Sequence, residues 1–305
     1  MSGAMRVLNF GSLNLDYVYR VDSFVKPGET KNCRSMQINC GGKGLNQSVA
    51  AARAGLDVYH AGYLGKDGGM LQEKLVEKGV DVSFLRASEE SSGNAIIQVN
   101  DAGQNCILLF GGTNRCLTEQ MIDKTLDAFG SEGLVLMQNE TNLVGEILQK
   151  AHDRGLLTAF NAAPMEDKVK GYPLDCLDYL FVNEIEGAAL AGSENPEEIL
   201  SVLTLHYPNL SVILTLGESG ACFAKGELRI FVPACRVPVR DTTAAGDTFT
   251  GFFLSGILSG QDPAGALRLA TAASALCIQK AGAADSVPSL AEVERALQSG
   301  ALALQ

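Results

Sequence analysis

The stretch from Asp241 to Leu258, which reads DTTAAGDTFTGFFLSGIL, joins a loop of small residues to an apolar helix. We expect the loop to cover residues 242–246 and the helix to carry Asp247 in its first turn. The phenylalanine, leucine and isoleucine residues that follow recur close to the i, i+3, i+4, i+7 spacing of a helix with a buried face. The stretch therefore predicts a helix that is packed in the core of a large domain and begins at an open loop.

The first turn of this helix is suited to hold an anion. Backbone N–H groups there have no intrahelical partner, and the helix dipole is positive at this end. Ala244, Ala245 and Gly246 have little side chain to block an approaching phosphoryl group. Asp247, beside that anion, can act as the general base that takes the proton of an attacking alcohol. The other interpretation is that Asp247 only caps the helix, as Asp often does.

Composition limits the classes of protein that remain. With 305 residues, 46% of them hydrophobic, the chain can build one large α/β domain. It has no run of about 18 apolar residues for a membrane span, and its start, MSGAM, lacks the apolar segment of a signal peptide. A net charge of −11 argues against nucleic acid as a partner. Eight cysteines without a CxxC motif indicate buried, reduced thiols and a cytoplasmic protein.

Apolar strands alternate with amphipathic helices along most of the chain. We expect strands at residues 6–11, 58–64, 134–138, 156–160, 179–182 and 212–216, and helices at 70–78, 119–128, 143–154, 186–191, 196–205, 264–281 and 290–298. Ser289 with Glu292 predicts a capping box for the last helix. This alternation predicts a doubly wound, mostly parallel sheet flanked by helices, as a single domain over residues 1–305.

Two further segments have the alternating pattern of antiparallel strands with one exposed face. They lie at about residues 15–40 and 93–110, with turn signals at Pro27-Gly28 and at residues 100–104. We expect them to form a small β-sheet inserted in the α/β domain. Such a sheet can act as a lid, and its apolar face can pair with a second copy in a homodimer.

Polar residues recur where the predicted strands end. They are Asn14 and Asp16, Glu140, Asn161, Asn183 with Glu186, and the loop 215–220. Each one alone can be a turn or a helix cap. Since ligands of open α/β sheets bind outside the carboxyl ends of the strands, the set together predicts a binding rim along one edge of the sheet. The three histidines, at 60, 152 and 206, stand apart from these positions and are expected to be structural or surface residues.

A second glycine-containing motif, GGKGLN, lies at residues 41–46. Its glycines allow the backbone to approach a ligand closely, and Lys43 and Asn46 stand at the entrance of a helix expected from about Leu45. The motif is neither a Walker A loop, which needs GxxxxGK[ST], nor the GxGxxG of a Rossmann dehydrogenase.

GGKGLN at 41–46 and DTTAAGDTFTGFF at 241–253 resemble the N-terminal and C-terminal signatures of the ribokinase (pfkB) family of sugar kinases. NAAP at 161–164, NEIE at 183–186 and TLGESG at 215–220 are also similar to family segments, so the resemblance covers nearly the whole chain. It implies an ATP-dependent kinase that phosphorylates the 5-hydroxymethyl oxygen of D-ribose. A kinase for deoxyribose, a ketohexose or a nucleoside, and a non-catalytic sugar or nucleotide sensor, are the alternatives.

The resemblance also implies roles for individual residues. The sugar hydroxyls would bind Asn14, Asp16, Gly42, Lys43, Asn46 and Glu140, with Asp247 as the base and Ala244, Ala245 and Gly246 as the anion hole. ATP would bind Asn183, Thr215, Gly217, Gly220, Gly246 and Thr271, and Glu186 would act on Mg²⁺ through water. A monovalent cation, K⁺, would be held by Asp241 and Ser286 and by carbonyls of Thr243, Cys277, Lys280 and Gly282. The chain departs from the family pattern at Thr271, Asp285 and GGTNRC (111–116).

Overall fold

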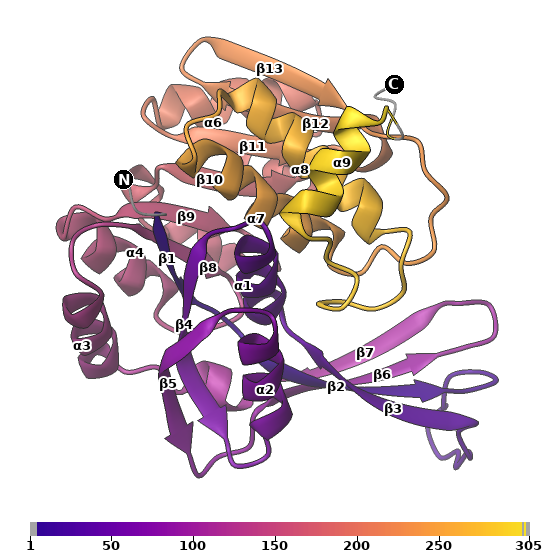
Figure 1. Cartoon of the computed structure of the whole chain (residues 1–305). Coiled ribbons are helices and arrows are strands. Elements are labelled where there is room, and N and C mark those ends of the chain that lie inside the picture. The colour runs from indigo at the N-terminus through magenta and orange to yellow at the C-terminus, as the bar shows by residue number, and fades with distance from the viewer. Residues whose placement is uncertain (1–4, 301, 303–305) are drawn as a thin grey trace.

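The described part of the chain, residues 5–300 and 302, forms two β-sheets and a set of helices in this computed structural model (Figure 1). The N-terminal segment MSGAM is expected not to be a signal peptide. Its first four residues, 1–4, lie outside the described residues. The larger sheet has nine strands among the described residues, in the order β13-β12-β11-β10-β9-β8-β1-β4-β5. The predicted doubly wound, mostly parallel architecture is confirmed.

The strands of the large sheet are β1 (Arg6–Phe10), β4 (Asp57–Gly65), β5 (Asp81–Ser88), β8 (Leu134–Gln138), β9 (Leu157–Asn161), β10 (Tyr179–Asn183), β11 (Ser211–Thr215), β12 (Gly220–Lys225) and β13 (Leu228–Pro233). The first seven of them pair in parallel, whereas β12 and β13 run antiparallel at one edge. The six predicted strands are all present; β5, β12 and β13 were not predicted.

Helices cover both faces of this sheet. They are α1 (Lys43–Arg53), α2 (Gly69–Glu77), α3 (Glu119–Phe129), α4 (Val144–Asp153), α5 (Glu184–Ala191), α6 (Pro196–His206), α7 (Ala245–Leu258), α8 (Pro263–Cys277) and α9 (Leu290–Gln298). Successive strand residues point to opposite faces, so Val7 lies in a core with α1, α7 and α8, and Leu8 lies in a second core with α3, α4 and α6. The capping box of Ser289 and Glu292 is confirmed.

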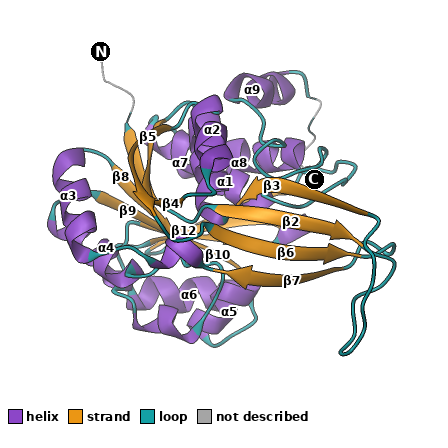
Figure 2. Cartoon of the chain, turned by 90° about the horizontal axis from the view of Figure 1, so that it is seen from below, coloured by secondary structure: helices purple, strands orange, loops and turns teal. Residues whose placement is uncertain are grey.

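The smaller sheet projects from one side of the domain (Figure 2). Its order is β3-β2-β6-β7, with β2 (Asn14–Arg20), β3 (Ser35–Gly41), β6 (Gly93–Val99) and β7 (Asn105–Phe110). We refer to these four strands as the lid sheet. β2 pairs antiparallel with β3 and parallel with β6, which joins the two predicted strand pairs. One detail of the prediction was wrong: Asn14 and Asp16 do not end the first strand but lie in β2 of the lid sheet.

Helix α7 begins earlier than predicted. Ala244 has a left-handed φ of 60°, and Ala245 and Gly246 already belong to the helix, so the loop before it is shorter than residues 242–246. The helix packs closely on α1, because a Cβ on Gly251 would lie 2.6 Å from the carbonyl carbon of Ala50. Helix α1 likewise begins at Lys43 rather than near Leu45. The two glycine-containing motifs therefore supply the first turns of two helices that touch.

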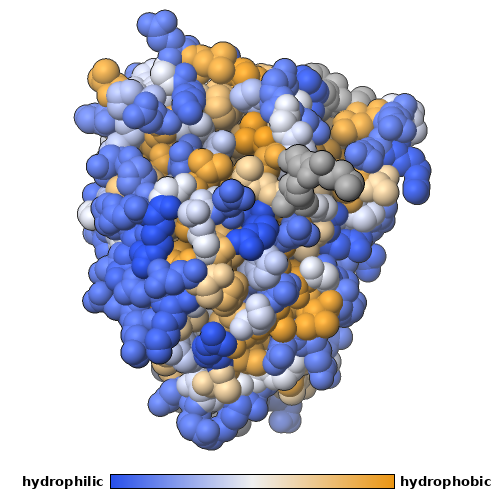
Figure 3. Space-filling view, turned by 60° about the vertical axis from the view of Figure 1, so that its left-hand side comes forward, coloured by the Kyte–Doolittle hydropathy of each residue, from blue (hydrophilic) through white to orange (hydrophobic). Residues whose placement is uncertain are grey.

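The surface is largely polar. On the face seen in Figure 3, hydrophilic residues cover most of the surface and hydrophobic residues gather in smaller areas among them. Among the helices of residues 5–300, none is both long enough and apolar enough to cross a membrane.

Candidate active site

Asp247 lies in the first turn of α7, where it is 6% exposed, and it faces the start of α1. Its two carboxylate oxygens each accept a hydrogen bond from a side-chain amide of α1. Asn46 Nδ2 donates to Oδ2 over 3.0 Å, and Gln47 Nε2 donates to Oδ1 over 2.9 Å. Asp247 therefore has tertiary partners and is not simply a helix cap; the N-cap position is held by Ala244.

A cavity of about 200 Å³ opens at this point. It is lined by Lys43, Asn161, Asn183, Glu186, Thr215, Thr242, Ala244, Ala245, Gly246, Asp247 and Thr250, among others. The nearby carboxylate of Asp247, against the effect of burial, raises the pKa of Lys43, and Glu140 and Glu186 act in the same direction. Lys43 thus carries a firmly held positive charge in a cavity that also contains two carboxylates.

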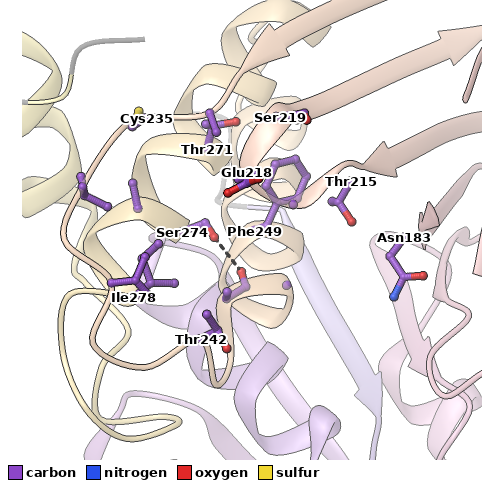
Figure 4. Close-up of a pocket in the computed structure, with 18 of the residues that line it drawn as sticks. Asn183, Thr215, Glu218, Ser219, Cys235, Thr242, Phe249, Thr271, Ser274 and Ile278 are labelled. Atoms are coloured by element: carbon purple, nitrogen blue, oxygen red, sulfur yellow. Dashed lines mark hydrogen bonds between the residues drawn. The ribbon is translucent and has the colours of Figure 1, made fainter. Parts of the chain in front are cut away.

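A much larger cavity, of about 1060 Å³, adjoins the first along the start of α7 (Figure 4). All six residues expected to bind ATP line it: Asn183, Thr215, Gly217, Gly220, Gly246 and Thr271. The two cavities share Asn183, Thr215, Thr242, Ala245 and Gly246 in their walls. The structure thus places the N-terminus of α7 where the two cavities meet.

Asn183 and Glu186 are also engaged with each other, which the sequence analysis did not anticipate. Glu186 accepts hydrogen bonds from the backbone N–H of Asn183 at 2.9 Å and from its Nδ2 at 3.1 Å, and its own N–H donates to Asn183 Oδ1. The pair is a capping box for α5, a pattern that N-x-x-E can indicate. Burial raises the pKa of Glu186, against a lowering effect of the Asn183 N–H.

The residues expected to bind the sugar lie where the lid sheet meets the domain. Glu140 Oε2 accepts from the Lys43 N–H at 2.9 Å and from the Ser12 hydroxyl. Burial, and then the charge of Glu140, raise the pKa of Asp16 to about 7. The Asp16 side chain fits because Gly41 lies beside it, where a Cβ would come within 2.0 Å of Asp16 Oδ2. Asn14, Asp16 and Glu140 line neither of the two cavities described above.

Most of the residues expected around a monovalent cation are also brought together. Asp241 accepts from the Thr243 N–H at 2.9 Å and from the Gly282 N–H at 2.9 Å. Burial works to raise the pKa of Asp241, but hydrogen bonds from the Thr243 hydroxyl and from these two N–H groups bring it below its usual value. Cys277 Sγ lies 3.0 Å from Ser286 Oγ and 3.8 Å from the carbonyl oxygen of Thr243.

Lys280 differs from the other members of this group. Its backbone N–H donates to the Cys277 carbonyl at 3.0 Å, while its ammonium group pairs with Glu292 at 3.3 Å. Within residues 5–300 and 302, no group of three or more His, Cys, Asp or Glu is placed to hold a metal ion. A cation in this region would therefore be bound mainly by backbone and hydroxyl oxygens.

Gln47 is the residue of the site that the sequence analysis missed. It follows Asn46 directly, and adjacent residues on a helix do not normally face the same partner. No sequence signal distinguishes it, because its contact with Asp247 depends on how α1 and α7 pack.

Comparison with known proteins agrees with this geometry. The model of the pfkB family carbohydrate kinases matches residues 5–290. A ribokinase of Haemophilus influenzae is 36% identical over 295 residues, which cover 92% of this chain and 95% of that protein. The ribokinase of Cryptococcus neoformans in complex with ADP has a TM-score of 0.85 at 32% identity, covering 96% of this chain and 99% of the other.

The Arabidopsis thaliana ribokinase complexed with ribose and ATP has a TM-score of 0.85 at 28% identity, covering 97% of this chain and 99% of the other. The match of the family model extends over both glycine-containing motifs and the residues around both cavities. The chain therefore belongs to the pfkB family of carbohydrate kinases.

Proposed function

We propose that this protein is a ribokinase, which transfers the γ-phosphoryl group of ATP to the 5-hydroxymethyl oxygen of D-ribose. The observation that carries the proposal is the position of Asp247, a buried carboxylate in the wall of one cavity and one residue after Gly246, which lines both. The similarity to ribokinases, one of them seen with ribose and ATP, supports ribose as the sugar.

The proposed reaction needs little covalent chemistry from the protein. Phosphoryl transfer depends mostly on positioning and on stabilisation of charge. Asp247 accepts the proton of the attacking sugar hydroxyl, and the N–H groups around Ala244, Ala245 and Gly246 hold the phosphoryl oxygens. The Ala245 N–H donates to the Thr242 carbonyl over 3.2 Å in this structure, so it exchanges that hydrogen bond for one to the anion. Lys43, which lines the same cavity, attracts the phosphates through its positive charge. Asn14, Asp16, Gly42, Asn46 and Glu140 bind the remaining sugar hydroxyls.

ATP occupies the larger cavity in this proposal, with its adenine near Thr271. Its Mg²⁺ suits the residues present, because Mg²⁺ keeps several waters and binds one or two carboxylates together with substrate phosphates. Glu186 is a buried carboxylate in the smaller cavity and would hold the ion through water. When bound, Mg²⁺ neutralises charge on the transferred phosphoryl group.

The oxygen-rich group around Asp241 supports a site for K⁺ as an activating cation. Asp241, Ser286 and the carbonyls of Thr243, Cys277, Lys280 and Gly282 are the proposed ligands, and such oxygen sites suit a large hard cation. Activity in KCl should exceed activity in choline chloride at the same ionic strength. Equal activity in the two salts would remove the cation from the proposal.

The outer strand of the lid sheet supports a homodimer. Ile107, Leu108 and Phe110 of β7 are 55%, 68% and 56% exposed, so this edge strand presents apolar side chains on both faces. An exposed apolar edge strand is typical of a surface that is buried in an interface. The same strand of a second copy is equally apolar and can pair with it. Leu108→Asp should shift sedimentation from dimer to monomer. Leu228→Asp, on the edge strand β13 and 50% exposed, is the matched control.

The direct test of the function is ADP release from Mg·ATP with a panel of ribose, deoxyribose, fructose, common hexoses and nucleosides. Turnover confined to ribose supports both the reaction and the substrate. Turnover on another member of the panel keeps the mechanism and assigns a different sugar. Absence of turnover with all of them, while ATP still binds, would favour a sugar or nucleotide sensor.

A further inference from the structure

A buried chain of side-chain hydrogen bonds runs from Asp247 into the large sheet. Gln47 Nε2 donates to Asp247 Oδ1, and Gln47 Oε1 in turn accepts from Gln138 Nε2 over 2.7 Å. The same nitrogen of Gln138, at the end of β8, also donates to Asn9 Oδ1 over 3.1 Å. Gln47, Gln138 and Asn9 are at most 1% exposed. Three elements, α7, α1 and β8, are therefore joined to β1 by amide groups that water does not reach.

A second arm continues from Asn9 to the next strand. Asn9 Nδ2 donates to Ser48 Oγ and to the Gly44 carbonyl, each over 2.8 Å. Ser48 Oγ lies 2.8 Å from His60 Nδ1, and His60 Nε2 lies 3.2 Å from the Gly11 carbonyl oxygen. His60, expected from the sequence to be a structural or surface residue, is fully buried in this arm.

The ends of the chain fix the direction of every hydrogen bond. A carbonyl only accepts, so His60 Nε2 carries the proton that faces Gly11. Burial lowers the pKa of His60 to about 4, so the ring is neutral and its Nδ1 accepts from the Ser48 hydroxyl. Ser48 Oγ then accepts from Asn9 Nδ2, which leaves Asn9 Oδ1 to accept from Gln138. Gln138 is thus the donor for both arms.

We propose that Gln47 and Gln138 are positioning residues for the base. Gln138 donates to Gln47 Oε1, and this contact holds the Gln47 amide with its N–H, rather than its oxygen, against Asp247. A reversed amide would place the Gln47 oxygen against the Asp247 carboxylate and the Gln47 nitrogen against the Gln138 nitrogen, which is strongly unfavourable in a buried site. Together with Asn46, the oriented Gln47 fixes the plane of the Asp247 carboxylate. The inference rests on the proposed role of Asp247 as the general base.

Two charged side chains, Lys43 and Glu186, interact electrostatically with Asp247, and neither is altered when Gln47 is changed. Lys43 of α1 attracts Asp247, and Glu186 of α5 repels it. The amide of Gln47 is neutral, so its removal alters neither of these charges. A shift in the pH dependence of turnover after a change at Gln47 therefore reports the lost hydrogen bond to the ionised base.

The test compares Gln47→Leu with Ser48→Ala, two neighbouring buried positions of the same chain of hydrogen bonds. Gln47→Leu should lower kcat by about 10- to 100-fold and move the acid limb of its pH profile to higher pH, because the ionised base loses a charge-assisted donor. KM for ATP should change less than about twofold. Ser48→Ala breaks only the His60 arm, since Asn9 keeps the Gly44 carbonyl, and should lower Tm with kcat unchanged.

Gln138→Met is the second variant, and it keeps the test decisive if Gln47→Leu does not fold. It keeps the approximate size of the side chain but removes the donating nitrogen without adding a charge, so the Gln47 amide loses the contact that orients it. It should also reduce kcat and shift the acid limb, to a smaller extent. If the folded variants at Gln47 and Gln138 lose only Tm, as Ser48→Ala does, the chain is structural and the inference is wrong.

Asp247→Asn, measured alongside, separates this inference from the proposed function. An inactive Asp247→Asn together with a fully active Gln47→Leu overturns the positioning role alone. A fully active Asp247→Asn overturns the assignment of the base, and the positioning role with it.

Discussion

Asn46 Nδ2 lies 3.0 Å from Asp247 Oδ2, although the two residues are 201 positions apart in the chain. The contact joins the two glycine-containing motifs into one unit, because each motif forms the first turn of a helix and the helices abut at Ala50 and Gly251. A change that separates α1 from α7 therefore displaces the proposed base even if neither motif is altered.

Asp247→Asn tests the proposed base directly. The amide is isosteric but does not accept a proton, so kcat should fall by about 10²- to 10⁴-fold while ATP affinity is retained. Steady-state kinetics and ATP titration measure the two effects. Asp262→Asn is the control: Asp262 also stands at the start of a helix, as the N-cap of α8, and Asn caps equally well there. A comparable loss in both variants would argue against the role of Asp247.

Glu186→Gln tests the proposed contact with Mg²⁺. Loss of the carboxylate charge should raise the Mg²⁺ concentration needed for half-maximal activity several-fold, because a neutral amide binds a hydrated cation less well. Activity as a function of free Mg²⁺ is the measurement. Glu292→Gln provides a close control, since Glu292 occupies the same N3 position of the other capping box. If both variants keep the wild-type Mg²⁺ dependence, Glu186 does not act on the ion.

Ribose affinity should depend on the ionisation of Asp16. Burial and Glu140 raise its pKa to about 7, so the carboxylate becomes a full acceptor for sugar hydroxyls only as pH rises through that value. KM for ribose should therefore fall between about pH 6 and pH 8. Asp16→Asn should raise KM and remove this dependence. A parallel fall in the variant would assign the titration to another group.

The same shift has a consequence for stability. Burial and Glu140 raise the pKa of the Asp16 carboxyl from 3.8 to about 7 in the folded state, so its contribution to stability is fully present below pH 3.8 and is lost as pH rises through about 7. Asp16→Asn should therefore increase the free energy of unfolding at pH 8, by about 4 kcal/mol at most. Urea denaturation at pH 8 and at pH 4 measures the difference, which should be small at pH 4.

His60 should make the protein sensitive to acid. Its pKa is lowered from 6.5 to about 4 by burial, so the unfolded chain binds more protons than the folded one between these values. Stability is fully present above pH 6.5 and is lost as pH falls toward 4, by about 3 kcal/mol in all. The pH dependence of unfolding should be weaker over this interval in His60→Gln than in the wild type.

Ala244 offers a test of backbone strain at the proposed anion hole. A left-handed φ of 60° is unfavourable for alanine, so Ala244→Gly should increase the free energy of unfolding, by about 1 kcal/mol. Ala245→Gly, the same substitution one residue later and inside α7, should decrease it by a similar amount. Chemical denaturation distinguishes the two. A loss of stability in both variants would mean that the left-handed residue is not strained.

The central strands could be predicted because short, nearly continuous apolar runs are typical of buried parallel strands. β8 was predicted with its observed bounds, and the other predicted strands of the sheet differ from the observed ones by one residue at one or both ends. β5 and β13 are the two edge strands of the sheet, where partly exposed residues weaken the apolar signal. β12 lies one strand in from the edge and is buried, but it is short and begins with the small residues Gly220 and Ala221. The prediction of a small β-sheet from two strand pairs is confirmed, but the parallel pairing of β2 with β6 that joins them has no sequence signal.

The sequence predicted which residues belong to the site better than it predicted the hydrogen bonds between them. The six residues expected at ATP do line one cavity, and Asp247 does meet the start of α1. Their roles remain predictions. The amide chain from Gln47 to His60 could not be found from sequence, because buried amides look like turn or cap residues until the packing of strands and helices gives each one its partner.

The junction of α1 with α7 also bears on biosynthesis. The ribosome completes α1, with the residues proposed to bind the sugar, long before it reaches Asp247. Asp247 lies in the last fifth of the sequence, so a nascent chain lacks the proposed base until that part is made. Until then, Ala50 and the buried residues around it in α1 are not covered by α7. The half-made protein therefore exposes an apolar part of α1 during synthesis, as incompletely folded chains commonly do.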